Sequence, residues 1–327
     1  HSLKQRKKFN KKIEFIIPKI QISEKIFLRF KYLLCLICLG NFLIKNKDTI
    51  VFSFQANIYC ILLCKILGIK IIVRSNSSPV GWYHNLFKKF LYKKIISLAD
   101  GVIVNSIDFK NQMKKRFNVK VKCIYNPLDK KQIIYKSKKG KKDIFFNNKK
   151  NHLKIINIGR LTNQKDQITI LKAINILKRY INLKLLIYGR GVEKDNLQNY
   201  INQNNLNSIV KIRTFIDNPY SVLKQSDLFI LSSKYEGLPN VLLEALTLKK
   251  FIISSECPTG PREILLDGKN GYLFKIGDYF QLSKKIKEYQ KNKFKIKKIS
   301  QKAFKTLDRF DYQKNLNEYH DYLKKFL

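Results

Sequence analysis

The sequence predicts an α/β fold made of two parallel-sheet halves joined by a linker. The chain has 327 residues, enough for two domains of roughly 150 residues each. Short apolar runs alternate with amphipathic stretches, as in folds where helices connect the strands of a parallel sheet. The alternation breaks once, in a segment rich in Lys and Asn, and then restarts. We therefore expect an N-terminal domain over residues 1–129, a linker over 130–150 and a C-terminal domain over 151–327.

In the first half, five apolar runs have the length and composition of strands. They cover residues 13–18, 49–54, 69–75, 101–106 and 120–126. Helices are predicted between them, over residues 22–39, 56–67, 82–97 and 107–117. This order of elements predicts a Rossmann-like, doubly wound domain.

The second half repeats this pattern. Strands are expected over residues 154–159, 183–189, 209–215, 227–233 and 251–256. After Gly277 the chain is expected to be helical and rich in Lys. Two such halves would face a cleft, and ligands of these folds bind where the carboxyl ends of the strands meet it.

The composition excludes a wholly disordered chain, and the net charge indicates an anionic binding partner without identifying it. Apolar residues make up 45 % of the chain, which is an ordinary globular share. Lys and Arg number 66 against 23 Asp and Glu, a net charge of +43 that favours an anionic partner: lipid headgroups, phosphates or nucleic acid. Abundant Lys, Asn and Ile are also what an AT-rich coding sequence produces, so the charge alone does not choose among these partners.

The cysteines and apolar stretches predict neither a metal site nor a spanning helix. Most of the six cysteines lie in apolar runs without a matching second pair, so we expect buried free thiols in a reducing compartment. The longest apolar stretch, 32–44, has 13 residues, whereas a spanning helix needs about 20. No secretory leader pattern opens the sequence.

Residues 81–97 predict a basic amphipathic helix with aromatic side chains. Trp82, Tyr83, Phe87 and Phe90 alternate there with four lysines at 88, 89, 93 and 94. Such a helix favours an anionic membrane surface. The alternative is a core helix with one solvated face.

Two glycine-containing turns follow predicted strands in the second half. Gly159-Arg160 ends a strand, and Lys165 follows before a helix. Glycine lets backbone approach a ligand closely, and the two cations could hold phosphate oxygens; a solvated basic loop explains them equally well. Gly189 and Gly191 form a second turn, which lacks the third glycine of a dinucleotide fingerprint.

The segment 231–274 contains the largest number of candidate functional residues. Glu236 and Gly237 stand between a strand end and a helix, and Pro239 suits a first helical turn. Glu244 lies about two turns along, where a carboxylate can accept hydrogen bonds from sugar hydroxyls. The alternative is a solvent-facing helix with two ordinary glutamates. The free N–H groups of the first turn would form an anion cradle around Leu238, Asn240 and Val241.

Ordered motifs in this half resemble the C-terminal domain of the retaining GT-B glycosyltransferases of family 4. Their signature of two glutamates separated by seven residues matches Glu236 and Glu244. The resemblance covers residues 153–280 well and the first half more loosely. The other matching motifs are GRLTNQKD (159–166), GRGVEKDNL (189–197), NPYSVLKQSDLFILSS (218–233) and ECPTGPREILLDGKNGYLF (256–274).

The resemblance implies roles for these residues. Arg160 and Lys165 would clamp the donor diphosphate and stabilise the leaving group, Glu236 would contact the donor sugar, and Glu244 would bind the ribose. Backbone at 237–241 would face the phosphates. The turns at Gly159, Gly189 and Gly191 would also contact the donor. The implied donor is a nucleotide sugar, UDP-linked, with no further cofactor. The sequence contains no Asp-x-Asp metal motif, so basic side chains would do the work of a metal.

The resemblance also implies an acceptor and a place in the cell. The acceptor would be a lipid-linked saccharide in polysaccharide, lipopolysaccharide or glycan biosynthesis. The enzyme would be cytoplasmic, peripheral at the inner face of the cytoplasmic membrane, with no nucleic-acid partner. The first half departs from the family: its first βα unit is expected to be missing, and Asn76 stands where many members carry a His. A GT-B nucleotide-sugar epimerase and a basic nucleic-acid binder are the alternatives.

Overall fold

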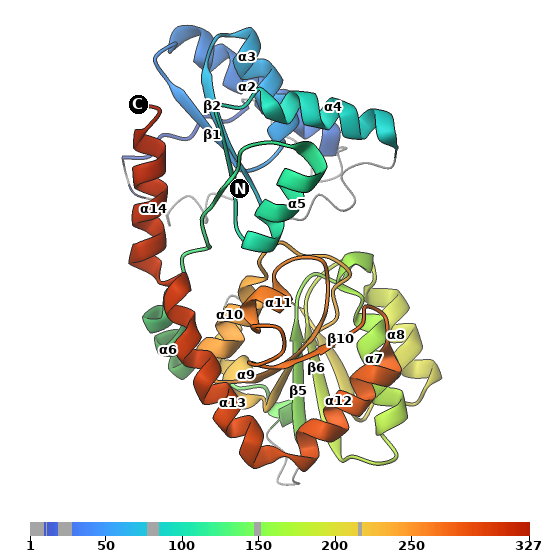
Figure 1. Ribbon diagram of the computed structural model, residues 1–327. Helices are drawn as coiled ribbons and strands as arrows, with labels where there is room; N and C mark the ends of the chain where they lie inside the picture. Colours follow the sequence, from blue (N-terminus) through green and yellow to red (C-terminus); the bar gives the residue numbers. More distant parts are fainter. Residues whose placement is uncertain (1–9, 11, 19–27, 77–84, 147–151, 215–217) are drawn as a thin grey trace. The chain divides into compact units, whose positions relative to one another are not determined.

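The computed structural model describes residues 10, 12–18, 28–76, 85–146, 152–214 and 218–327. The chain forms two compact units (Figure 1). The first contains residues 1–75, 85–103 and 326–327, and the second contains 76–84 and 104–325. The expected boundaries at 129 and 151 stay a prediction.

The first sheet has four strands in the order β1-β2-β3-β4. Its strands and the neighbouring helices are α2 (Leu28–Lys45), β1 (Ile50–Ser53), α3 (Asn57–Ile66), β2 (Lys70–Ser75), α4 (Leu86–Ser97), β3 (Gly101–Val104), α5 (Ile107–Phe117) and β4 (Lys122–Cys123). Strands β1 and β2 are parallel, with Ile50 paired to Lys70. Three successive residues of β2, from Ile71 to Val73, are buried, as expected of a strand covered on both faces.

The strand predicted over residues 13–18 is wrong. These residues are described, and they form no regular structure. Ile13, Phe15, Ile16 and Ile17 are each between 39 and 52 % exposed. A strand needs a neighbour for its backbone N–H and C=O groups, and an apolar run by itself does not supply one.

The second sheet has six strands in the order β10-β9-β8-β5-β6-β7, and each neighbouring pair is parallel. The five strands expected in this half are confirmed, and β10 is an additional one. The strands are β5 (Leu153–Ile158), β6 (Leu183–Tyr188), β7 (Val210–Arg213), β8 (Leu228–Leu231), β9 (Phe251–Ser255) and β10 (Tyr272–Phe274). The helices between them are α7 (Gln167–Leu177), α8 (Lys194–Gln203), α9 (Tyr220–Gln225), α10 (Asn240–Thr247) and α11 (Pro261–Ile264).

Beyond residue 277 the chain is helical, as the sequence predicts. It forms α12 (Tyr279–Lys291), α13 (Lys293–Lys305) and α14 (Tyr312–Lys324). Two buried apolar clusters flank the second sheet, one against α7 and α12 and the other against α10 and the 303–310 region. The second sheet is therefore a doubly wound sheet with helices on both faces, as Figure 1 shows.

The order of the six strands reverses between β5 and β8. From β5 the chain builds outward through β6 and β7, then returns to the other side of β5 and builds outward through β8, β9 and β10. The two helical connections that leave this point lie on opposite faces of the sheet, and in folds of this kind ligands bind at such a point, outside the carboxyl ends of the strands. This point defines where a ligand of the second unit would bind.

Residues 130–146 of the segment expected as a linker are structured, and residues 147–150 lie outside the described part of the chain. Helix α6 (Lys130–Lys139) begins at Asp129, whose side chain accepts a hydrogen bond from the N–H of Gln132, and it packs against α9. The amide of Asn218 donates to the carbonyl of Lys136 at 2.9 Å. Further along, the Asp143 carboxylate accepts from the Tyr188 hydroxyl at 2.5 Å and pairs with Arg213 at 3.2 Å. Through these contacts residues 130–146 pack as an integral part of the second unit.

Among the described residues, no helix is long and apolar enough to cross a membrane. No group of three or more His, Cys, Asp or Glu in that part of the chain could hold a metal ion. The six cysteines are free thiols, as expected, and burial is confirmed for Cys60, Cys64 and Cys257. Cys38 and Cys123 are half-buried and Cys35 is exposed, so the expectation of burial is wrong for these three.

Candidate functional site

The site lies at the carboxyl edge of the second sheet. Ile158, the last residue of β5, pairs with Tyr188, the last residue of β6. Gly159 and Gly189 therefore leave the sheet side by side. On the other side of β5, strand β8 ends at Leu231, directly before Ser232 and Ser233. The parallel register thus brings the predicted segments 159–165, 189–191 and 232–237 to one edge of the sheet.

The two glycines of the second turn are required by the backbone of the first. A Cβ atom at Gly189 would lie 1.9 Å from the carbonyl oxygen of Gly159. Gly191 has φ 156°, and its Cβ would lie 2.1 Å from the carbonyl oxygen of Leu161. The N–H of Leu161 donates to the carbonyl of Arg190 at 2.8 Å, which ties the turns together. These glycines hold the basic loop against the sheet edge, a role separate from any contact with a ligand.

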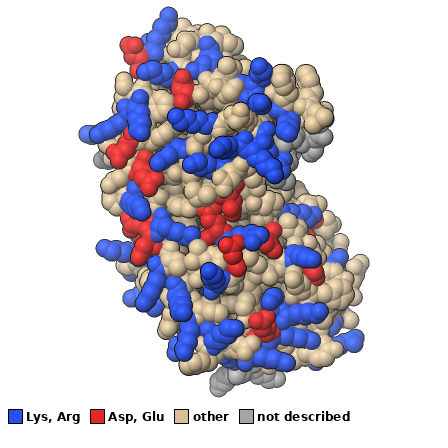
Figure 2. Space-filling model, in the orientation of Figure 1, with Lys and Arg blue, Asp and Glu red and all other residues tan. Residues whose placement is uncertain are grey.

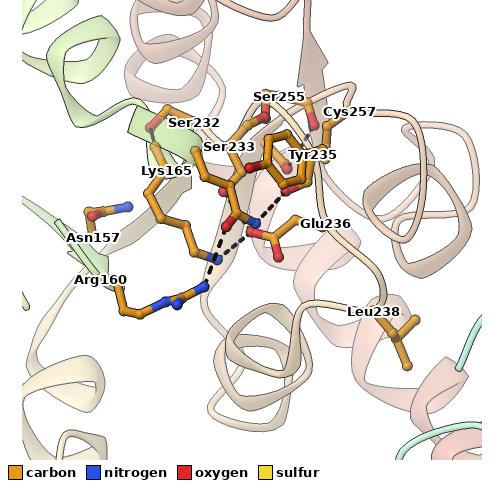
Figure 3. A network of polar contacts seen from close by, with 12 residues as sticks. Asn157, Arg160, Lys165, Ser232, Ser233, Tyr235, Glu236, Leu238, Ser255 and Cys257 are labelled. Carbon is orange, nitrogen blue, oxygen red and sulfur yellow. Dashed lines mark hydrogen bonds and ion pairs between the residues drawn. The ribbon is translucent and has the colours of Figure 1, made fainter. Parts of the chain in front are cut away.

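Lys165 and Glu236 form an ion pair at this edge. The Nζ of Lys165 lies 2.5 Å from Oε1 of Glu236, and the two side chains are only 16 and 9 % exposed. The hydroxyl of Ser233 donates to the same Oε1 at 2.6 Å. Figure 3 shows these groups converging from the loop after β5 and the loop after β8. Removing one partner of so buried a pair would leave an uncompensated charge, at a cost of about 3–5 kcal/mol.

Arg160 lies at the rim of the same group. Its side chain is exposed and reaches the side-chain oxygen of Gln164 at 3.4 Å. The Gln164 amide donates in turn to the carbonyl of Tyr235 at 2.9 Å, next to Glu236. The structure therefore brings Arg160, Lys165 and Glu236 into one polar network (Figure 3). Two cations and a carboxylate at a strand-order reversal can bind an anionic ligand that also carries hydroxyl groups.

The start of helix α10 lies beside this network. Pro239 occupies the N-cap position, one residue earlier than the predicted first turn, and its side chain has no donor or acceptor to cap the helix. The helix begins at Asn240, which is exposed, followed by the half-buried Val241. Leu238 is buried, and in Figure 3 its side chain lies apart from the polar network. Gly237 connects Glu236 to this turn, whose backbone, rather than its side chains, can contact a ligand.

Glu244 is held by a different partner. The hydroxyl of Tyr220 donates to its Oε1 at 3.3 Å, and within the described structure no hydrogen bond joins it to the Lys165–Glu236 pair. Burial raises the pKa of the Glu244 carboxyl, and the hydrogen bond from Tyr220 opposes that rise. Burial also raises the pKa of Tyr220 to about 12, so its hydroxyl remains a donor at neutral pH.

Several residues of the site are absent from the sequence prediction. Ser233, Gln164 and Tyr220 each hold a predicted residue or its neighbour in place. Asn157, inside β5, donates to the carbonyl of Ile230 across the sheet at 2.8 Å. One signal was available for Ser233, because a serine three residues before a glutamate at a strand end is spaced to hydrogen-bond it locally. No local signal pointed to Tyr220, which is far from Glu244 in the chain.

Cys257 also approaches the network and is chemically inert there. Its thiol is 1 % exposed, and burial, reinforced by the nearby Glu236 carboxylate, raises its pKa to about 12. A thiol that stays protonated is a poor nucleophile and a poor metal ligand. The sulfur therefore acts as a small apolar group behind Glu236.

The chain has two parallel sheets, the second of them doubly wound, and the solved structures that superpose on it show that it has the α/β GT-B fold of glycosyltransferases. Sucrose-phosphate synthase from Thermosynechococcus elongatus superposes with a TM-score of 0.77 at 16 % identity, over 95 % of this chain and 82 % of that one. Anabaena HepE in complex with UDP-glucose superposes with a TM-score of 0.75 at 16 % identity, over 89 % and 82 %. At this identity the likeness shows a shared fold.

The chain belongs to the glycosyl transferases group 1 family, whose model matches residues 139–306. It is 36 % identical over 221 residues to an uncharacterized glycosyltransferase of Methanocaldococcus jannaschii, covering 63 % of this chain and 53 % of that protein. It is 29 % identical over 335 residues to a Campylobacter jejuni enzyme, covering 91 % and 89 %. That enzyme is named N-acetylgalactosamine-N,N'-diacetylbacillosaminyl-diphospho-undecaprenol 4-alpha-N-acetylgalactosaminyltransferase.

Proposed function

We propose that this protein is a retaining glycosyltransferase of family 4 that moves a sugar from a UDP-linked donor to a lipid-linked saccharide. The observation that carries the proposal is the pairing of Lys165 with Glu236 beside Arg160, at the point where the strand order reverses. The name of the Campylobacter relative, which includes a diphospho-undecaprenol acceptor, supports the acceptor class. The product would enter a cell-surface polysaccharide, a lipopolysaccharide or another glycan.

The reaction breaks the bond between the anomeric carbon and the β-phosphate oxygen and forms a bond from that carbon to an acceptor oxygen. Negative charge grows on the leaving diphosphate as the bond breaks. Lys165 and Arg160 stabilise that charge more in the transition state than in the bound donor, which lowers the barrier. The acceptor proton passes to the leaving phosphate oxygen, on the face where the acceptor attacks, so the anomeric configuration is retained.

Glu236 and Glu244 divide the recognition of the donor. Glu236 contacts the sugar that is transferred, and Glu244 accepts hydrogen bonds from the ribose. The first turn of α10, with the turns at Gly159 and Gly189, approaches the diphosphate through its backbone. Cationic side chains supply the charge that a divalent metal supplies in other transferases, so the reaction needs no metal or further cofactor.

Helix α4 is the proposed contact with the inner face of the cytoplasmic membrane. Leu86, Phe87, Phe90 and Leu91 share one side of the helix and are 81, 73, 58 and 44 % exposed. The helix carries four lysines, and its buried Ile95 and Ile96 anchor it to the first unit. An apolar stripe beside lysines matches the boundary between acyl chains and anionic headgroups. Trp82 and Tyr83 lie outside the described residues.

The net charge by itself does not favour nucleic acid. Figure 2 shows that basic side chains are spread over the drawn face instead of being confined to one groove. A nucleic-acid binder would show a basic track with interleaved aromatics or a known reading motif, and the sequence contains neither.

A donor panel tests the proposed function. The protein is mixed with UDP-, GDP-, ADP- and dTDP-linked sugars, and melting temperature and release of nucleoside diphosphate are measured. We expect a UDP-sugar to raise the melting temperature and to be hydrolysed slowly without acceptor. Conversion of one nucleotide sugar into its epimer would instead identify an epimerase. Absence of any shift or hydrolysis, together with salt-sensitive DNA binding, would refute the proposal.

A further inference from the structure

Three buried serines surround the site, and their hydroxyls have different partners. Ser232 donates to the backbone carbonyl of Lys165 at 2.7 Å, and Ser255 donates to the backbone carbonyl of Ser233 at 2.6 Å. Ser233 alone among the three donates to a charged side chain, Oε1 of Glu236, at 2.6 Å. All three side chains are 0 % exposed, so water does not compete for these bonds.

The bond from Ser233 is of the strong kind. An O–H donor to an ionised carboxylate at 2.5–2.7 Å is charge-assisted and about twice as strong as a neutral hydrogen bond. Lys165 donates to the same oxygen. Two donors from different loops fix both the position and the rotation of the carboxylate, because Oε1 cannot turn away without losing both.

The other oxygen of Glu236 has no hydrogen-bond partner among the described residues. The carboxylate is therefore held by one oxygen, and Oε2 keeps its acceptor capacity. Ser233 lies three residues before Glu236, so this restraint is local and does not depend on the loop that carries Lys165.

We propose that Ser233 is a positioning residue that holds Glu236 by Oε1 and so presents Oε2 to the donor sugar. This inference rests on the proposed function. Ser233 itself touches neither the diphosphate nor the sugar, and it acts through Glu236 alone. Lys165 has a second task at the diphosphate, whereas Ser233 has only this one.

The test compares Ser233→Ala with Ser226→Ala. Ser226 is an equally buried serine whose hydroxyl donates to the Leu223 carbonyl, away from the site. We expect S233A to lower kcat for the UDP-sugar identified by the donor panel by about 10- to 100-fold. This is the size of effect expected when one hydrogen bond to a charged group is lost. The KM for that sugar and the Kd for UDP should stay within about threefold, because neither measures the sugar's transition state. S226A should keep the wild-type kcat, and Ser233→Thr, which keeps the hydroxyl, should recover most of it.

A double-mutant cycle separates positioning from a general structural role. If Ser233 acts through Glu236, adding S233A to Glu236→Ala costs nothing further in single-turnover transfer. Alanine is used because a glutamine at 236 could still accept the serine's hydrogen bond. A kcat for S233A within twofold of wild type would overturn the proposal, and so would a full, additive loss in the double variant. A wild-type protein that neither binds UDP nor transfers sugar would refute the proposed function itself.

Discussion

Lys165 donates to Oε1 of Glu236 at 2.5 Å, across 71 residues of sequence, and the Glu236 side chain is 9 % exposed. The lysine proposed to bind the donor diphosphate is thus neutralised by the carboxylate proposed to bind the donor sugar. A ligand with a diphosphate next to a sugar would meet both members of the pair. The pair therefore links binding of the diphosphate to binding of the sugar.

Replacing Glu236 by Gln should separate donor binding from transfer. We expect transfer to fall by at least about 100-fold, because the amide lacks the charge that the carboxylate places beside the sugar. Binding of UDP should persist or tighten, because Lys165 is freed from its carboxylate. Calorimetric titration of UDP and initial rates of transfer measure the two effects.

The matched control is Glu318→Gln on α14, which removes the same charge from a half-exposed carboxylate that lies 3.9 Å from the Lys122 ammonium. It should leave both quantities unchanged. A near-normal transfer rate for Glu236→Gln would remove this residue from the site.

Lys165→Ala should weaken both UDP binding and turnover, each by about 10- to 100-fold, because one cation interacts with the diphosphate in both the ground state and the transition state. The variant also leaves Glu236 without its cation, so the melting temperature should fall. Lys172→Ala, an exposed lysine on α7, is the control and should behave as wild type. Unchanged binding and kinetics for Lys165→Ala would make Lys165 a structural lysine.

Glu244→Gln should raise the stability of the protein and weaken its binding of the donor. The raised pKa of Glu244 means that the folded state holds this proton more tightly than the unfolded state does. Protonation of Glu244 therefore stabilises the fold at pH values below the pKa that this carboxyl has in the unfolded chain. The stabilisation is lost as the pH rises through its pKa in the folded protein. At pH 7 the neutral amide should therefore raise the melting temperature, and the gain should vanish near pH 4.

The same variant should weaken UDP binding, since an amide replaces a charged acceptor for the ribose. Melting curves at pH 4 and pH 7, with UDP titration at pH 7, measure both effects. A stability gain that is equal at the two pH values would contradict the linkage, and unchanged UDP affinity would place the ribose elsewhere.

Replacing Lys88, Lys89, Lys93 and Lys94 by Gln should release the protein from anionic vesicles. Each lysine near a charged surface contributes about 1 kcal/mol, so four should lower the partition coefficient by about three orders of magnitude at low salt. Co-sedimentation with vesicles of phosphatidylglycerol and phosphatidylcholine measures it. The control carries the same charge change on α13, at Lys293, Lys295, Lys297 and Lys298. Equal loss in both variants would mean that net charge, not α4, governs binding.

Local pattern was enough to predict most elements of both sheets. The strands β5, β6, β8 and β9 consist mainly of buried Ile, Leu and Phe, and such short apolar runs can be recognised in the sequence. The 13–18 run shows the limit of this inference, because its apolar residues match a strand while the structure shows no regular secondary structure there. Helix α6 shows the same limit, since this Lys-rich helix packs against α9 and accepts a hydrogen bond from Asn218, both of which are distant in the chain.

The sequence by itself determined the alternation of strands and helices, the glutamates at 236 and 244, and the basic loop after β5, because each depends on residues close together in the chain. Only the tertiary structure decided that Lys165 meets Glu236 while Glu244 meets Tyr220. The reason is that strand order and register are set by packing across the whole sheet, so which loop ends face one another is not encoded in any single segment.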